Sequence, residues 1–117
     1  MPKRIILDNT VLSNLALVGQ ADLVFHLWPE RVITTREVLR EYARAAQAGL
    51  LPPHVWSDLP VAELTPEETA RAEAFPPRLG SGERSCIAVA HARGGLFASD
   101  DADARRAAQR LGIAMSG

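Results

Sequence analysis

The sequence predicts an α/β fold with a largely parallel sheet, built as one domain. Short, mostly apolar runs alternate along the chain with longer stretches of helical periodicity, which is the pattern of successive β–α units. The length of 117 residues is that of a single domain. A hydrophobic share of 47% and a charged share of 23% indicate a globular chain rather than a disordered one.

In its first half the chain is expected to alternate strands and helices from near its start. The run RIIL is apolar after Arg4 and ends at Asp8, as in a buried strand. Val38 and Tyr42 recur at helical spacing, and Thr34 or Thr35 can cap the helix that holds them. The predicted elements are a strand at Arg4–Leu7, helices at Thr10–Leu17 and Ala21–Leu27, a strand at Arg31–Thr34 and a helix after Thr34 or Thr35.

In the second half of the chain, prolines and glycines indicate where the helices and strands begin and end. The stretch 50–60 contains three prolines and is expected to be irregular. Thr65 followed by Pro66 is a helix opening, and Gly94-Gly95 and Gly112 are helix stops. The predicted elements are an edge strand at Pro60–Leu64, helices opened by Thr65, by Gly80-Ser81-Gly82 and by Ser99-Asp100-Asp101, a strand at Leu96–Ala98 and a final strand at Ile113–Met115.

The composition argues against several classes of protein. No apolar run approaches the ~20 residues that cross a bilayer, so no membrane partner is expected. The segment before Asp8 is too short for a signal peptide, and the single cysteine, Cys86, cannot form an internal disulfide. Both features favour a cytoplasmic protein. The formal net charge of −1 gives no overall basic field of the kind that attracts nucleic acid.

Acidic residues follow two of the predicted strands directly. Asp8 ends the first strand, and Asp100 and Asp101 come after the strand at Leu96–Ala98. The carboxyl ends of parallel strands meet at one edge of a sheet, where ligands bind. These carboxylates are therefore expected at a common edge. Each also has an ordinary interpretation, because Asp8 could cap the helix after it and Asp100 or Asp101 could cap the last helix.

Two glutamates on predicted helices are expected at the same edge. Glu41 lies three residues after Val38, and Glu83 lies four residues before Ile87, so each shares the apolar side of its helix. Carboxylates that face a core are costly unless they are paired or bind a metal. A group of oxygen ligands selects a hard cation, Mg²⁺ or Mn²⁺. Crowded carboxylates also repel, so at least one is expected to have a raised pKa without metal. Taken singly, both glutamates could be ordinary helix residues.

A basic stripe accompanies Glu41 on its helix. Arg36, Arg40 and Arg44 are spaced by four residues and could contact phosphates beside the acids. A solvated helix face explains the same spacing, and both interpretations remain open.

The order of these motifs resembles the PIN-domain family over nearly the whole chain. Asp8 occupies the first acidic position in IILDNTVLSNL, which is similar to the family's opening strand and helix. Glu41 occupies the second in TTREVLREY. Glu83 and Asp101, or Asp100 in its place, occupy the third and fourth in GSGERSCIAVAHARGGLFASDDADARRAAQRLGI. Many members have Asp where this chain has Glu83.

The resemblance implies a three-layer α/β sandwich with helices on both sides of a central, mainly parallel sheet. It implies one PIN-like domain over residues 1–117; relatives usually continue, which leaves truncation at the C-terminus open. The implied activity is that of a Mg²⁺- or Mn²⁺-dependent endoribonuclease. The implied catalytic residues are Asp8, Glu41, Glu83 and Asp101, with Asp8, Glu83 and Asp101 or Asp100 as metal ligands and Asn9 and Thr10 in support.

The resemblance also implies partners. Many small members are toxins of toxin–antitoxin pairs, similar to VapC-type proteins, and commonly form homodimers, so an RNA substrate, an antitoxin protein and a second copy are expected. Apolar residues after the first strand are the expected dimer contact: Val18, Leu23, Val24 and Leu27.

Rival folds fit the residues less well. A haloacid-dehalogenase-type phosphohydrolase needs an Asp two residues after Asp8, where Thr10 lies, and a receiver domain needs a late lysine, whereas Lys3 is the only one. The serious alternative is a degenerate PIN-like module that binds RNA or a protein without cutting.

Overall fold

Parallel strands form the centre of the molecule. The computed structural model describes residues 3–54 and 56–114. Over those residues the sheet has four strands in the order β3-β2-β1-β4, and every pair is parallel. In the register of the sheet, Ile6 of β1 lies opposite Ile33 of β2 and Phe97 of β4. The strands are β1 (Ile5–Leu7), β2 (Val32–Thr35), β3 (Val61–Ala62) and β4 (Leu96–Ala98).

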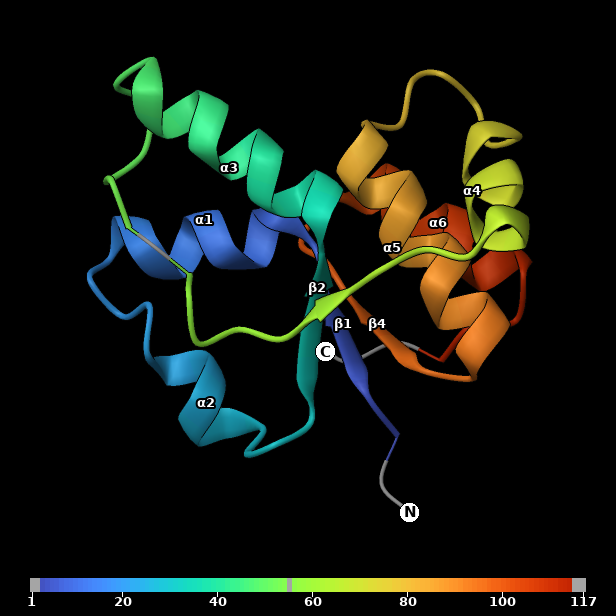
Figure 1. Ribbon diagram of the computed structural model, residues 1–117, viewed down its shortest axis with the longest axis horizontal. Helices are drawn as coiled ribbons and strands as arrows, with labels where there is room; N and C mark the ends of the chain where they lie inside the picture. The colour runs from blue at the N-terminus through green and yellow to red at the C-terminus, as the bar shows by residue number, and fades with distance from the viewer. Residues whose placement is uncertain (1–2, 55, 115–117) are drawn as a thin grey trace.

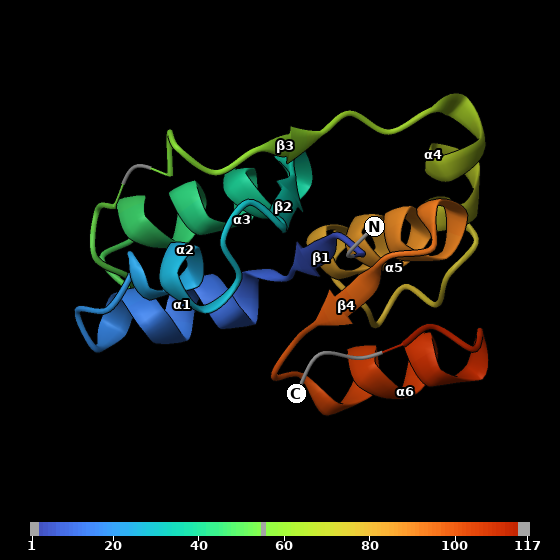
Figure 2. The same cartoon turned by 90° about the horizontal axis from the view of Figure 1, so that it is seen from below.

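Helices cover the sheet on both sides. Figure 1 shows the carboxyl ends of β1 and β2 leading directly into the first turns of two helices. In Figure 2, α1, α2 and α3 lie to the left of the strands, and α4, α5 and α6 lie to the right. The helices are α1 (Asn9–Leu17), α2 (Leu23–Leu27), α3 (Arg36–Gln47), α4 (Pro66–Glu73), α5 (Ser81–Arg93) and α6 (Ala102–Arg110). This is the three-layer α/β arrangement that the sequence predicts.

The core follows from continuous apolar runs. All three residues of β1 are buried, as expected for a parallel strand covered on both faces. The segment from Ser85 to Ala90 is buried along its entire length, because α5 packs on the sheet as well as against α3 and α4. Asp8 directly follows β1, and Glu83 lies in the first turn of α5, so both acids adjoin elements that are packed in the core.

Local signals set most helix boundaries as predicted. Thr35 caps α3 by accepting a hydrogen bond from the N–H of Val38. Thr65 and Glu68 form a reciprocal capping box at the start of α4. Gly94 ends α5 in the left-handed conformation, with a φ of 65°. These caps are decided within a few residues of sequence, which is why the sequence predicts them.

Several predicted elements differ from the structure in their bounds, and one is wrong. The edge strand expected at Pro60–Leu64 is shorter, at Val61–Ala62, and the strand expected at Arg31–Thr34 lies one residue later, at Val32–Thr35. The helix expected from Ala21 begins only at Leu23. The final strand expected at Ile113–Met115 is wrong over its described part, because Ile113 and Ala114 have no strand assignment. Among the described residues, the carbonyl of Ala114 accepts a hydrogen bond from the N–H of Phe97 in β4, and no second backbone bond joins these two segments there. Met115 lies outside the described residues.

A partly buried ion pair joins α4 to the end of α5, and the side chain of Arg93 in it is 41% exposed. Glu68 is only 4% exposed, and its two carboxylate oxygens accept hydrogen bonds from Arg93 at 2.8 and 2.9 Å. Arg93 also donates to the carbonyl of Glu63, just after β3. The hydrogen bonds from Arg93 are the main reason why the pKa of Glu68 is lowered.

In the part of the chain that the structure describes, no helix combines the length and apolar character needed to cross a membrane.

Candidate active site

Asp8 lies at the carboxyl end of β1 with no exposed surface. Its Oδ1 accepts a hydrogen bond of 2.7 Å from the N–H of Asn9, so Asp8 does cap α1. Its Oδ2 accepts a second bond of 2.7 Å from the hydroxyl of Ser99, which follows β4. Thr10 contributes a longer bond to the same oxygen, at 3.4 Å. A simple surface cap needs only the first of these bonds, so Asp8 is held more tightly than capping requires.

Ser99 connects the ends of β1 and β4, and sequence reasoning did not single it out as a site residue. Besides donating to Asp8, its oxygen accepts a bond of 3.0 Å from the N–H of Asp101. The only signal in the sequence is its position between the strand and Asp100, which is also typical of a helix opening. The bridge itself depends on pairing between strands 91 residues apart in the sequence.

Glu41 and Glu83 meet where α3 crosses the start of α5. A Cβ built on Gly80 would lie 3.0 Å from Oε2 of Glu41 and 3.6 Å from Oε1 of Glu83, so the two carboxylates flank the same backbone. A Cβ on Gly82 would lie 2.1 Å from Oε1 of Glu41 and 3.1 Å from Val38. The glycines at 80 and 82 therefore leave the space into which Glu41 extends.

The carboxylates act on one another through their charges. The pKa of Asp8 is raised to about 6, first by burial and then by the charges of Glu41 and Asp101, against the lowering effect of the bond from Ser99. The pKa of Glu83 is raised to about 7 by burial, followed by the charges of Asp8, Asp101 and Glu41. The predicted rise in pKa is thus confirmed, but burial contributes more than the repulsion from which it was expected.

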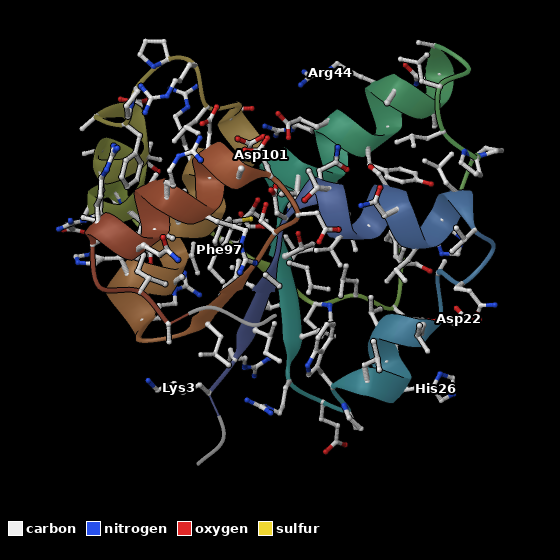
Figure 3. All side chains as sticks on the ribbon, turned by 180° about the vertical axis from the view of Figure 1, so that it is seen from behind. Lys3, Asp22, His26, Arg44, Phe97 and Asp101 are labelled. Atoms are coloured by element: carbon white, nitrogen blue, oxygen red, sulfur yellow. The ribbon has the colours of Figure 1, made fainter. Side chains whose placement is uncertain are left out.

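Asp101 and Asp100 have different surroundings. Asp101 begins α6 and accepts a bond of 2.9 Å from the N–H of Ala104, so it is the helix cap. Figure 3 shows it at the start of α6, near the end of the sheet where α1 begins. Asp100 is exposed and its carboxylate accepts a bond of 2.7 Å from the amide of Asn14 on α1. Of these two residues, only Asp101 is among the charges that raise the pKa values of Asp8 and Glu83. The choice between them as the fourth acid stays a prediction.

Thr10 and Asn9, the two predicted supporting residues, differ in how they contact Asp8. Thr10 bonds to Asp8, to the hydroxyl of Ser99 at 3.2 Å and to the N–H of Asp100 at 2.9 Å, so it braces the end of β4. Asn9 supports Asp8 through its backbone N–H, whereas its side chain accepts a bond from Ser13 on the same helix. Thr10, rather than the side chain of Asn9, positions this carboxylate.

The arginine stripe on α3 does not act as a unit. Arg36 forms an ion pair with Glu63, which follows β3. Arg40 and Arg44 are exposed, and neither takes part in an ion pair within the described residues. Figure 3 shows the Arg44 side chain extending away from α3. Arg40 and Arg44 are thus available for contacts with phosphate, whereas Arg36 already has a carboxylate partner.

The carboxylate oxygens at this edge of the sheet are of the type that binds a hard cation, although they are not arranged as a complete set of ligands. Over residues 3–54 and 56–114, no three Asp, Glu, His or Cys side chains lie close enough together to hold an ion. Yet none of the ion pairs between described residues involves Asp8, Glu41, Glu83 or Asp101. Partly buried carboxylates without a basic partner are costly, and a divalent cation would compensate their charge. Asp8, Glu83 and Asp101 are the residues whose oxygens would hold it.

The fold and this edge define an α/β protein in which acidic side chains gather at the carboxyl ends of parallel strands. The chain belongs to the PIN-domain family: the family model DUF3368, described as PIN domain, matches residues 4–117. Members of this family are generally nucleases that use divalent metals.

Among solved structures, the chain is similar to the crystal structure of PAE2754 from Pyrobaculum aerophilum. The two are 18% identical and superpose with a TM-score of 0.60, over 96% of this chain and 98% of that one. At that identity the similarity shows the fold alone. A comparison with curated proteins gave no match.

Proposed function

We propose that this PIN-domain protein is a metal-dependent endoribonuclease that hydrolyses phosphodiester bonds of RNA. The observation that carries the proposal is the group of Asp8, Glu41, Glu83 and Asp101. The pKa values of Asp8 and Glu83 are raised by burial and by the charges of the other acids, and no member of the group has a basic partner among the described residues. Sites that bind catalytic metals show such perturbed carboxylates. Structural caps explain Asp8 and Asp101 singly but not the convergence of all four.

Each carboxylate has a role in the proposal. Asp8, Glu83 and Asp101 would hold Mg²⁺ or Mn²⁺, with Asp100 as the alternative to Asp101, and Glu41 would complete the acidic wall. The bound ion would supply a water activated for attack on phosphorus and stabilise the departing oxygen. Ser99 and Thr10 fix the orientation of the Asp8 carboxylate through the hydrogen bonds described above.

The substrate strand would approach across α3. Arg40 and Arg44 are exposed on the helix that contributes Glu41, so their guanidinium groups can pair with phosphates on either side of the cut. Such contacts position a strand without reading its sequence.

Two partners are proposed from the family resemblance. Leu17 and Val18 at the end of α1 are 58% and 68% exposed, which makes the end of α1 suitable for a second copy in a homodimer. Leu27, expected in the same contact, is 53% exposed but lines a separate cavity of about 160 Å³. Val24, expected in the same contact, is instead buried in the core and is removed from the proposal. If the protein is a VapC-type toxin in the cytoplasm, its activity would be restrained by an antitoxin protein. A protein that light scattering shows to be a monomer would argue against the dimer.

Replacing Asp8 tests the nuclease directly. Asp8→Asn keeps the size of the side chain but removes its charge, so cleavage of a labelled single-stranded RNA in Mg²⁺ or Mn²⁺ should fall by at least ~10²-fold. Stability should be equal or higher, because a buried carboxylate with a raised pKa is removed. A residue that only caps a helix would give the reverse result, a loss of stability with an unchanged rate.

Glu67→Gln is the matched control, since Glu67 is an exposed acid in the first turn of α4, outside the edge. EDTA should abolish cleavage by the parent and by the control equally. A parent protein that cuts no RNA in either metal would overturn the proposal and favour a module that binds RNA or a protein without cutting.

A further inference from the structure

A small cavity lies directly beside the acidic edge, by which we mean the end of the sheet where Asp8 and the three other acids of the proposal lie. It has a volume of about 160 Å³ and lies between α1, the segment after α2 and the start of α6. Its apolar wall and its polar rim are built from distinct residues. The wall includes Val11, Leu15 and Trp28, and the rim includes Asn14, Asp100 and Arg105.

We propose that this cavity binds one base of the RNA strand, next to the phosphodiester held at the acidic edge. The inference rests on the proposed function and names the part of the substrate that gives the site its selectivity. A typical pocket for a drug-sized ligand has ~300–1,000 Å³, so this cavity suits a single ring system better than a larger molecule.

The cavity and the acidic edge share a residue. Ser99 lines the cavity, its hydroxyl donates to Asp8 at 2.7 Å, and its carbonyl accepts a bond of 3.0 Å from Arg105 at the rim. A nucleotide whose phosphate lies at Asp8 therefore has its own or its neighbour's base within reach of the cavity. A larger cavity of about 430 Å³, lined by Tyr42 and Trp56, includes none of the four acids and lacks this connection.

The lining has the chemistry that recognises a base in a single strand. Trp28 brings to the wall an aromatic side chain, the type on which bases stack, and Val11 and Leu15 supply apolar contact. Asn14 donates to Asp100 over 2.7 Å, which places an amide and a carboxylate together at the rim. Amide, carboxylate and guanidinium groups are those that hydrogen-bond to base edges. Stacking would give affinity, and the rim would give preference among bases.

Binding in EDTA tests this site without cleavage. Anisotropy of a fluorescein-labelled single-stranded RNA should show that Trp28→Ala weakens binding about 5- to 150-fold, the effect of losing one stacked base. Trp28→Phe should retain most of the affinity, because the aromatic face remains. Asn14→Ala, at an exposed position, should weaken binding and alter the preference among homopolymer RNAs.

An abasic scan separates base from backbone. Removing the base at one position of the RNA should weaken binding to the parent protein, while the same removal should not weaken binding to Trp28→Ala any further. Leu50→Ala is the control, since Leu50 is an exposed apolar residue that does not line the cavity. Melting curves establish that each variant is folded; if Trp28→Ala is not, Asn14→Ala and the abasic scan on Trp28→Phe take its place.

The possible failures are distinguishable. Unchanged RNA affinity in folded variants at Trp28 and Asn14, or a parent that binds no RNA, overturns the base site. If those variants keep their affinity but light scattering shows an altered oligomeric state, the cavity is an interface between copies. A protein that binds RNA through Trp28 but never cuts it in metal retains the base site and loses the nuclease.

Discussion

The hydroxyl of Ser99 donates to Oδ2 of Asp8 over 2.7 Å and thereby fixes the first acid of the edge to the end of β4. Because this bond lowers the pKa of Asp8, Ser99→Ala should raise that pKa above about 6. Loss of the bond should also lower the free energy of unfolding by about 1–3 kcal/mol, measurable in urea, and should reduce RNA cleavage near neutral pH. Ser13→Ala should leave all three quantities nearly unchanged, since among the described residues the side chain of Ser13 bonds only to Asn9, at 3.3 Å. Equal effects of the two substitutions would show that the Ser99 bond has no special role.

Gly82→Ala should separate activity from stability. Alanine favours a helix interior over glycine by about 1 kcal/mol, but its Cβ would lie 2.1 Å from Oε1 of Glu41 and 3.1 Å from Val38. The flexible end of Glu41 can swing away, so the melting temperature should change little while RNA cleavage falls sharply. Ala92→Gly, at an exposed site on the same helix, should lower stability without affecting the rate. A Gly82→Ala protein as active as the parent would show that Glu41 is dispensable.

Divalent metal should stabilise the folded protein in a manner that depends on pH. Burial and neighbouring charges raise the pKa of Asp8 to about 6 and that of Glu83 to about 7. Each of these two groups therefore binds protons more strongly in the folded state than in the unfolded state, so their contribution to the stability of the metal-free protein is lost as pH rises from about 4 to about 7.

Because the ion binds deprotonated carboxylates, millimolar Mg²⁺ or Mn²⁺ should raise the melting temperature more at about pH 8 than at about pH 5.5. Thermal scans with EDTA as reference measure the difference. An increase of the same size in Asp8→Asn as in the parent would place the ion elsewhere.

The ion pair between Glu68 and Arg93 should stabilise the folded protein near neutral pH, and this stabilisation should be lost in acid. The pKa of Glu68 is lowered from its ordinary value of 4.5, chiefly by the bonds from Arg93, so the pair stabilises the protein above about pH 4.5. This contribution is lost as pH falls through the lower pKa of the folded state. Glu68→Gln should reduce the free energy of unfolding near pH 7 by roughly 1–3 kcal/mol, and its urea midpoint should vary less than the parent's in acid. Glu63→Gln should have little effect, because the pair of Glu63 with Arg36 is exposed.

The sequence determined the features that depend on near neighbours. Thr65 was identifiable as a cap, and the cap of α3 could be narrowed to Thr34 or Thr35, because a cap bonds to an N–H three residues ahead. The continuous apolar run of β1 indicated a parallel strand buried on both faces, and the acids after β1 and β4 were assigned to one edge because parallel strands end together. The fold class, the order of the elements as far as α6, and the placement of Asp8 and of Asp100 or Asp101 after their strands follow from such short-range or topological rules.

Only the tertiary structure decided which side chains meet. Asp100 bonds to Asn14 across 86 residues of sequence, Arg36 pairs with Glu63 across 27, and Ser99 reaches Asp8 across 91. None of these contacts follows from periodicity, because periodicity gives the side of an element on which a residue lies and not its partner on another element. The cavity beside Trp28 has the same origin, since its walls come from α1, the end of α2 and the start of α6. The sequence by itself thus determined where the acids lie along the strands, and packing decided their protonation, their supports and the shape of the space beside them.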